Sequence, residues 1–213
     1  MSQSTTLQST NPPSTTSFTS SRAFAALAFT PAVRAAQSRN GSRDAARDGP
    51  RQDRLEEYET DFIAARDSFY QATVGETAWP YVQHRGGPAG FLKVLDERTL
   101  AYADLRGNLQ YLSVGNLTAN DRISLILMDY AKRRRLKIWG RVRIVAAAED
   151  AALMARLAMP GQRGRLERAI VIDVEAYDWN CPQHITPRYT EAEVERMLAP
   201  LLEENRRLRA GAG

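Results

Sequence analysis

The sequence has little of what disulfide-stabilised modules and metal centres need. Its 213 residues include one cysteine, Cys181, and two histidines, His84 and His184. One cysteine forms no intrachain disulfide, and these three residues do not have the ligand spacing of a zinc site. We therefore predict no metal site. For Cys181 and His184 we expect a small buried thiol and a hydrogen-bonded histidine rather than a nucleophilic pair.

Long hydrophobic runs are also missing. The longest, around Ile123 to Met128, has the length of a strand, far short of the ~20 residues that span a bilayer. Residues 1–28 are rich in Ser and Thr, and we predict a disordered tail there. No acid precedes Asp44, and Arg and Ala follow the Ser/Thr stretch, which is also typical of an organellar transit peptide. We expect a cytoplasmic protein with no membrane partner, and organellar import stays open as the alternative.

The positive charge of the chain is concentrated at one end. The formal net charge is +4, but residues 1–50 alone hold five arginines and only two acids. The rest of the chain is nearly neutral, whereas a nucleic-acid-binding domain carries a broad basic excess on its folded surface. We therefore expect no nucleic-acid partner.

The pattern along the chain indicates a mainly β fold with flanking helices. Apolar residues at helical spacing predict a helix from Leu55 to about residues 66–68. Seven short segments rich in β-branched and aromatic residues then read as strands, at 68–74, 79–85, 91–95, 99–105, 122–130, 136–145 and 169–177. Helices are predicted at 149–159 and 190–213, with Pro200 kinking or dividing the second. Strands without long helices between them favour an antiparallel barrel or sandwich.

Three polar clusters could carry chemistry. The first is the glycine-rich stretch 86–90 after His84 and Arg85, which matches no dinucleotide or triphosphate motif. The second, residues 103–117, combines side-chain donors with a turn at Gly107 into a short helix, where free N–H groups suit an anion. The third is the basic run 132–137, where strand alternation places Arg133, Arg135 and Lys137 on one face. Each cluster also has a purely structural interpretation: the first is a wide turn between strands, the second a polar turn into a short helix, and the third a solvated hairpin edge.

Together the clusters resemble a known family. The elements QHRGG, RGN followed by S-x-GNL, and NCPQHI occur in that order, and the likeness covers roughly residues 29–189. They resemble the flavin-nucleotide-binding branch of the pyridoxamine 5'-phosphate oxidase-like family. The resemblance implies a six-stranded antiparallel split β-barrel that forms a homodimer and holds FMN in grooves between subunits. It divides the chain into the tail 1–28, an FMN-binding domain 29–189 with an N-terminal helical segment, and a C-terminal helix 190–213.

The resemblance also implies site residues. Lys93 and Tyr102 correspond to a cofactor-contacting lysine and tyrosine, and Arg106 and Asn108 fall in the phosphate-binding loop. Arg135 stands where the family has a glutamine against the flavin ring, which is a departure. The full set of predicted cofactor-binding residues is His84, Arg85, Gly86, Lys93, Tyr102, Asp104, Arg106, Gly107, Asn108, Tyr111, Arg135, Lys137 and Trp179.

The implied function is an FMN-dependent oxidoreductase with an unidentified small substrate. The oxidase's C-terminal Arg-x-His substrate motif has no counterpart, so pyridoxal phosphate production itself is not expected. Hydride transfer requires no catalytic acid or base, and the catalytic residues are left unassigned. Two alternatives stay open. One is a flavin-binding or sensor module without turnover, and the other is a split barrel that uses a deazaflavin or haem.

Overall fold

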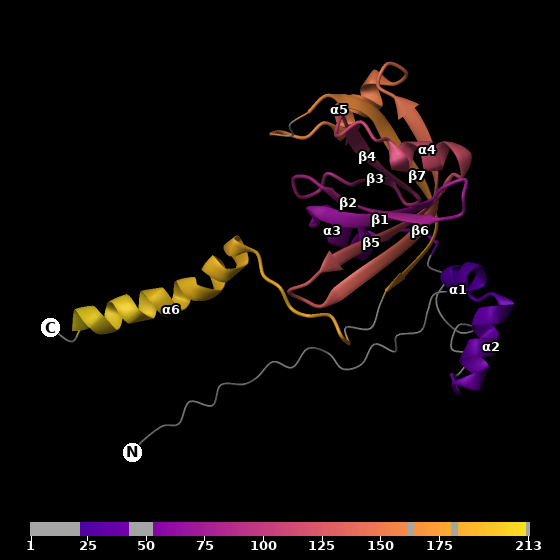
Figure 1. The fold of residues 1–213 in the computed structure, drawn as a ribbon. Coiled ribbons are helices and arrows are strands. Elements are labelled where there is room, and N and C mark those ends of the chain that lie inside the picture. Colours follow the sequence, from indigo (N-terminus) through magenta and orange to yellow (C-terminus); the bar gives the residue numbers. More distant parts are fainter. Residues whose placement is uncertain (1–21, 43–52, 162–163, 180–182, 212–213) are drawn as a thin grey trace.

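A single antiparallel sheet of seven strands forms the body of the protein (Figure 1). The computed structural model describes residues 22–42, 53–161, 164–179 and 183–211. The strands are β1 (Ser68–Val74), β2 (Pro80–Gly86), β3 (Lys93–Asp96), β4 (Thr99–Leu105), β5 (Arg122–Asp129), β6 (Arg134–Ala146) and β7 (Leu166–Trp179). Their order in the sheet is β2-β1-β5-β6-β7-β4-β3. The predicted mainly β fold is confirmed, with the seven strands that the pattern indicated rather than six.

The sheet curls so that strands near its two edges approach each other. Arg85 on β2, one edge strand, forms an ion pair with Asp104 on β4, which lies next to the other edge. The edge strands β2 and β3 do not pair with each other, so the barrel stays split. Alternate residues point inward, and the enclosed core includes Phe69, Leu125 and Ile172. Burial of this apolar surface is the main force that holds the curled sheet.

Three short helices pack against the curled sheet, α3 and α4 on the main core and α5 on the opposite face of β4 and β7. α3 (Glu57–Ala64) starts with a capping box between Glu56 and Glu59 and buries Phe62 and Ile63. α4 (Leu112–Ala119) buries Leu117 in the main core. α5 (Ala151–Leu157) is capped by Asp150 and packs against β4 and β7 in a second apolar cluster. The predicted helices at 55–66 and 149–159 and the short helix after Gly107 are thus present.

Two further helices precede α3 in the chain. α1 (Arg22–Ala28) buries Phe24 and Ala25 and packs against β7, and α2 (Pro31–Arg39), capped by Thr30, buries no residue. α1 lies within the stretch assigned above to the tail, and it packs on the sheet because Phe24 stacks against Trp139 at 4.7 Å between ring centroids. The remainder of the predicted tail, residues 1–21, lies outside the described residues.

The last helix projects away from the body (Figure 1). α6 (Glu191–Gly211) is one unbroken helix with Pro200 inside it, so the alternative of a divided helix is wrong. Within the described ranges no helix has the length and apolar character needed to cross a membrane. Cys181 and most of the NCPQH element lie outside the described residues.

Candidate functional site

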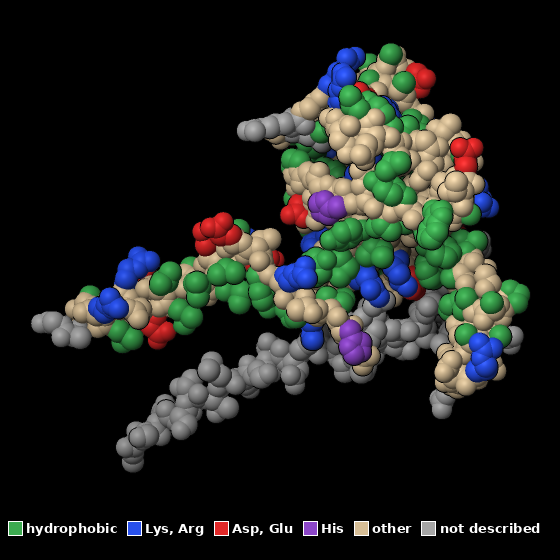
Figure 2. Space-filling model, in the orientation of Figure 1, with side chains coloured by type: hydrophobic (Ala, Val, Ile, Leu, Met, Phe, Trp, Pro, Cys, Tyr) green, Lys and Arg blue, Asp and Glu red, His purple; other side chains and the backbone are tan. Residues whose placement is uncertain are grey.

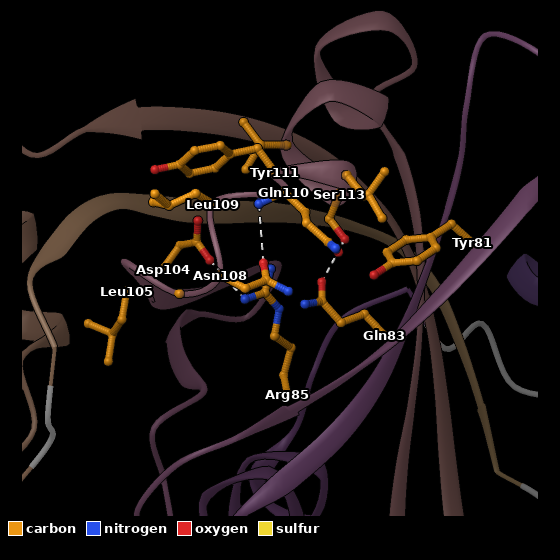
Figure 3. A pocket seen from close by; sticks show the side chains of 13 residues that line it. Tyr81, Gln83, Arg85, Asp104, Leu105, Asn108, Leu109, Gln110, Tyr111 and Ser113 are labelled. Atoms are coloured by element: carbon orange, nitrogen blue, oxygen red, sulfur yellow. Dashed lines mark hydrogen bonds and ion pairs between the residues drawn. The ribbon is translucent and has the colours of Figure 1, made fainter.

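A small cavity lies where β2, the end of β4 and the start of α4 meet (Figure 3). Its volume is about 70 Å³. The walls come from alternate residues of β2, from the end of β4 with the loop that follows, and from the first turn of α4. They are Tyr81, Gln83, Arg85, Asp104, Leu105, Gly107, Asn108, Leu109, Gln110, Tyr111, Leu112, Ser113 and Val114. A volume of a few water molecules suits one compact polar group.

A chain of buried charges forms the floor of this cavity. Asp104, whose side chain is 6% exposed, accepts a hydrogen bond from Arg85 Nη1 at 2.9 Å, and Arg168 Nη1 lies 3.7 Å from its second oxygen. Arg168 in turn contacts Glu167 at 2.6 Å. Arg85 Nε is buried and makes no hydrogen bond in the described part of the chain. A buried donor without a partner is costly, and the remaining guanidinium N–H groups of Arg85 face the cavity that it lines.

Beneath the arginine lies a buried tyrosine. The Arg85 guanidinium stands over the Tyr102 ring at 5.6 Å, and the Tyr102 hydroxyl donates to Gln71 Oε1 at 2.6 Å. Burial raises the pKa of Tyr102 well above its ordinary value, although the charge of Arg85 opposes the shift. Tyr102 therefore stays protonated as a hydrogen-bond donor. It supports Arg85 from within the core and has almost no exposed surface of its own.

The loop between β4 and α4 is held in an unusual backbone conformation. Leu109 and Tyr111 have φ angles of 65° and 50°, in the left-handed region that side chains other than glycine rarely adopt. Tyr111 is the N-cap residue of α4 and makes no side-chain cap, so the first N–H groups of the helix remain available beside the cavity. Strain of this kind concentrates at ligand sites. The loop is braced where the Tyr111 hydroxyl donates to Glu167 at 3.0 Å.

The structure brings together only part of the predicted set. Arg85, Asp104, Gly107, Asn108 and Tyr111 line the cavity. Arg106 stands beside it, half-exposed, with its Nε 3.9 Å from a Glu167 oxygen. These six residues form one group.

Two predicted residues on β2 lie beside the cavity without lining it. His84 points to the opposite face of the strand, against the Tyr70 ring at 5.4 Å. Gly86 ends the strand. In the glycine-rich loop after it, a side chain at Gly87 would meet the Phe91 ring at 2.8 Å, and Gly90 has a φ of 76°. These glycines are thus explained by packing and by a tight turn.

The remaining predicted residues lie elsewhere on the sheet. Lys93 is on β3, and Trp179 packs on Phe62 and donates to Glu59 at 2.8 Å. Arg135 and Lys137 lie on β6, on the outer face of the sheet. Arg133, predicted on the same face, belongs instead to the turn before β6, with a φ of 51°.

The outer face around Lys137 forms a second cationic region. Lys137 contacts Asp178 at 2.7 Å and stands over the Phe24 ring of α1 at 4.6 Å. Arg135 Nε, like Arg85 Nε, is buried without a hydrogen bond among the described residues. We call Arg135, Lys137, Trp139 and Phe24 the outer-face cluster. In the described ranges, no group of three or more His, Cys, Asp or Glu side chains is arranged to hold a metal ion.

Sequence reasoning missed four residues of the site. Tyr81 and Gln83 share a face of β2 with Arg85, and that alternation was visible in the sequence. Arg168 and Glu167, which contact Asp104 and the Tyr111 hydroxyl behind the cavity wall, gave no such signal, because their place depends on the register that pairs Asp104 with Arg168 across β4 and β7.

Comparison with known families decides the relationship. A family model described as pyridoxamine 5'-phosphate oxidase matches residues 55–179, more than half of the chain. The chain belongs to the pyridoxamine 5'-phosphate oxidase family. The family match runs from the residues before α3 to the end of β7 and so contains the whole cavity and the sheet residues of the outer-face cluster. Helices α1, α2 and α6 lie outside it.

Solved structures with a similar fold have low identity. A putative pyridoxamine 5'-phosphate oxidase from Lactobacillus delbrueckii is 16% identical, with 59% of this chain and 94% of that chain covered and a TM-score of 0.47. HupZ from Group A Streptococcus is 18% identical, with 63% and 99% covered and a TM-score of 0.47. A structure named F420 reductase is 21% identical, with 58% and 98% covered and a TM-score of 0.42. No match was found among curated proteins.

Proposed function

We propose that the protein is an FMN-binding flavoprotein that acts as an oxidoreductase on a small substrate. The observation that carries this is the cavity, where Arg85 is fixed by Asp104 with a buried Nε that no described residue satisfies. Arg106, Asn108 and the open first turn of α4 surround the same space. Arginine guanidinium groups and free backbone N–H groups are the hydrogen-bond donors that typically bind a phosphate monoester.

The small size of the cavity supports a role in binding only one part of the cofactor. A volume of about 70 Å³ suits the phosphate group and leaves the isoalloxazine ring outside. The outer-face cluster supplies the rest of the proposal, since Lys137 stands over the Phe24 ring and Arg135 lies two residues away on the same face of β6. Cavity and cluster lie in different parts of one chain, so we propose a homodimer in which the cavity of one protomer and the cluster of its partner serve one FMN.

Bound FMN supplies the electron transfer, and the chain binds and orients it. Arg85, Arg106 and Asn108 hold the phosphate. Arg135 places positive charge near the ring, which favours the reduced anionic flavin. Lys93, Tyr102 and Trp179 complete the proposed set, with Tyr102 acting through Arg85 because its side chain is buried.

The visible spectrum of the purified full-length protein tests this function. We expect flavin absorbance that is retained on desalting or restored by added FMN, and bleaching when a nicotinamide donor is supplied. A protein that takes up no FMN contradicts the proposal. One that binds FMN without turnover is a flavin-binding or sensor module. Competition of F420 or haem against FMN decides between the cofactors.

A further inference from the structure

Helix α6 carries an apolar face with nothing upon it (Figure 2). At 100° per residue its apolar residues form a stripe spread over roughly 140°. The stripe consists of Val194, Met197, Leu198, Leu201 and Leu202, with Leu208 about two turns further, and these residues are 41% to 68% exposed. A stripe of this width is typical of a helix that packs against another element.

The body of the same protomer does not cover the stripe. Thr190 caps the first turn of α6, where its N–H donates to Glu193 Oε2 at 2.8 Å. Ala192, Glu193 and Arg196 line a cavity together with Met128 and Tyr130, which places the start of the helix against the end of β5. From that anchor the helix runs outward (Figure 1). Folding it back onto its own sheet would break this attachment.

On one flank of the stripe, acidic side chains lie near the start of α6 and basic side chains lie near its end. Glu191 and Glu195 lie in the first half of the helix, and Arg206 and Arg209 lie in the second half. At 100° per residue all four fall on one flank of the stripe. Glu191 and Arg209 are equally far from Pro200, and Glu195 and Arg206 nearly so. The charges of this flank therefore match those of the same flank on a second α6 that runs in the opposite direction.

We propose that α6 pairs in antiparallel orientation with α6 of a second copy of this chain, with Leu201 near the two-fold axis. In this register Glu191 of one helix faces Arg209 of the other, and Glu195 faces Arg206. The two apolar stripes cover each other. In a parallel pair this flank would instead face the opposite flank of the second helix, which holds Glu193 and Glu204, so Glu191 and Glu195 would lose their arginine partners. The inference does not depend on flavin binding.

Cysteine cross-linking of the full-length chain locates the pairing. In a Cys181→Ser background, Leu201→Cys is expected to give a disulfide-linked dimer under mild oxidation, while Val194→Cys alone is not. Val194→Cys combined with Leu208→Cys is expected to restore it. Arg196→Cys, on the far side of the helix, is the control. Cross-linking by Val194→Cys alone would show a parallel pair and overturn the proposal. So would the absence of any cross-link in the Leu201→Cys chain, the result expected if α6 packs on its own body.

A charge exchange in the Leu201→Cys chain tests the complementarity. Glu191→Arg with Glu195→Arg makes the flank basic, and Arg206→Glu with Arg209→Glu makes it acidic. Each double variant alone should cross-link about tenfold more slowly. A mixture of the two, with one tagged, should form the heterodimer at the original rate. Equal rates in all cases would contradict the proposed register. Circular dichroism checks that each variant keeps its helix content.

Discussion

The cavity and the outer-face cluster hold cations in two different ways. In the cavity, Arg85 and Arg168 share the buried carboxylate of Asp104, so their positions are set by ion pairs. On the outer face, Lys137 has one carboxylate partner and otherwise lies on an aromatic ring contributed by α1. The comparison teaches that ion pairs within one chain fix the arginine side chains at the cavity. The cations of the outer face lie instead beside apolar and aromatic side chains, with fewer ion pairs to hold them.

Removing the carboxylate should have the largest effect. Asp104→Ala removes the buried carboxylate that pairs with Arg85, while Arg168 keeps its contact with Glu167, and breaking a buried pair in this way costs about 3 kcal/mol. Denaturant unfolding measures it. Asp173→Ala is the matched control, because its pair with Arg143 is exposed and its loss should cost less than about 0.5 kcal/mol. Equal losses in the two variants would show that Asp104 does not organise the cavity.

A methyl group at Gly140, the residue after Trp139, should disrupt the packing of β6 against β7 and the core residue Ile172. In Gly140→Ala the new Cβ would lie 2.6 Å from the backbone oxygen of Asp173, so β6 and β7 must shift, and we expect a loss of about 2 kcal/mol. Thermal unfolding and Trp fluorescence report it. Gly107→Ala, with no atom near its added Cβ, should leave stability unchanged. A stable Gly140→Ala protein would mean that this part of the sheet is more adaptable than its packing indicates.

Arg106→Ala should separate binding from folding. Its contact with Glu167 is long and half-exposed, so stability should change little. Loss of a charge-assisted bond to phosphate should weaken FMN binding by about 1.5 kcal/mol, or roughly tenfold. Fluorescence titration with FMN, and with riboflavin as the ligand that lacks the phosphate, measures it. Arg143→Ala provides an exposed arginine for comparison. Unchanged FMN affinity would remove Arg106 from the phosphate site.

The smallest effect on stability is expected at the outer face. Arg135→Gln introduces the residue implied by the family resemblance and should alter unfolding by less than about 0.5 kcal/mol. In the FMN-loaded protein it removes a positive charge near the ring, so the reduction potential should become more negative. Arg133→Gln, in the turn, is the control. An unchanged potential would place the ring away from Arg135.

The strands and the loop after β4 could be predicted from the sequence, because the alternation of apolar residues and the presence of turn residues are local signals. It also placed Arg85 and Arg106 in the right vicinity. It did not reach Arg168 or the packing of Phe24 on Trp139, because both depend on contacts between distant segments. The assignment of Tyr102 as a direct contact came from the resemblance, and the structure instead shows a buried ring beneath Arg85.

The register of β4 on β7 also has a consequence for folding. Asp104 meets Arg168 only after strands more than sixty residues apart have paired, and it meets Arg85 only when the sheet has curled. Contacts of such high sequence separation form late and slowly. The cavity is therefore a property of the complete fold, absent from any isolated hairpin of the chain. An anion bound there stabilises only the finished protein, so occupancy should raise the melting temperature of the whole domain in a single transition.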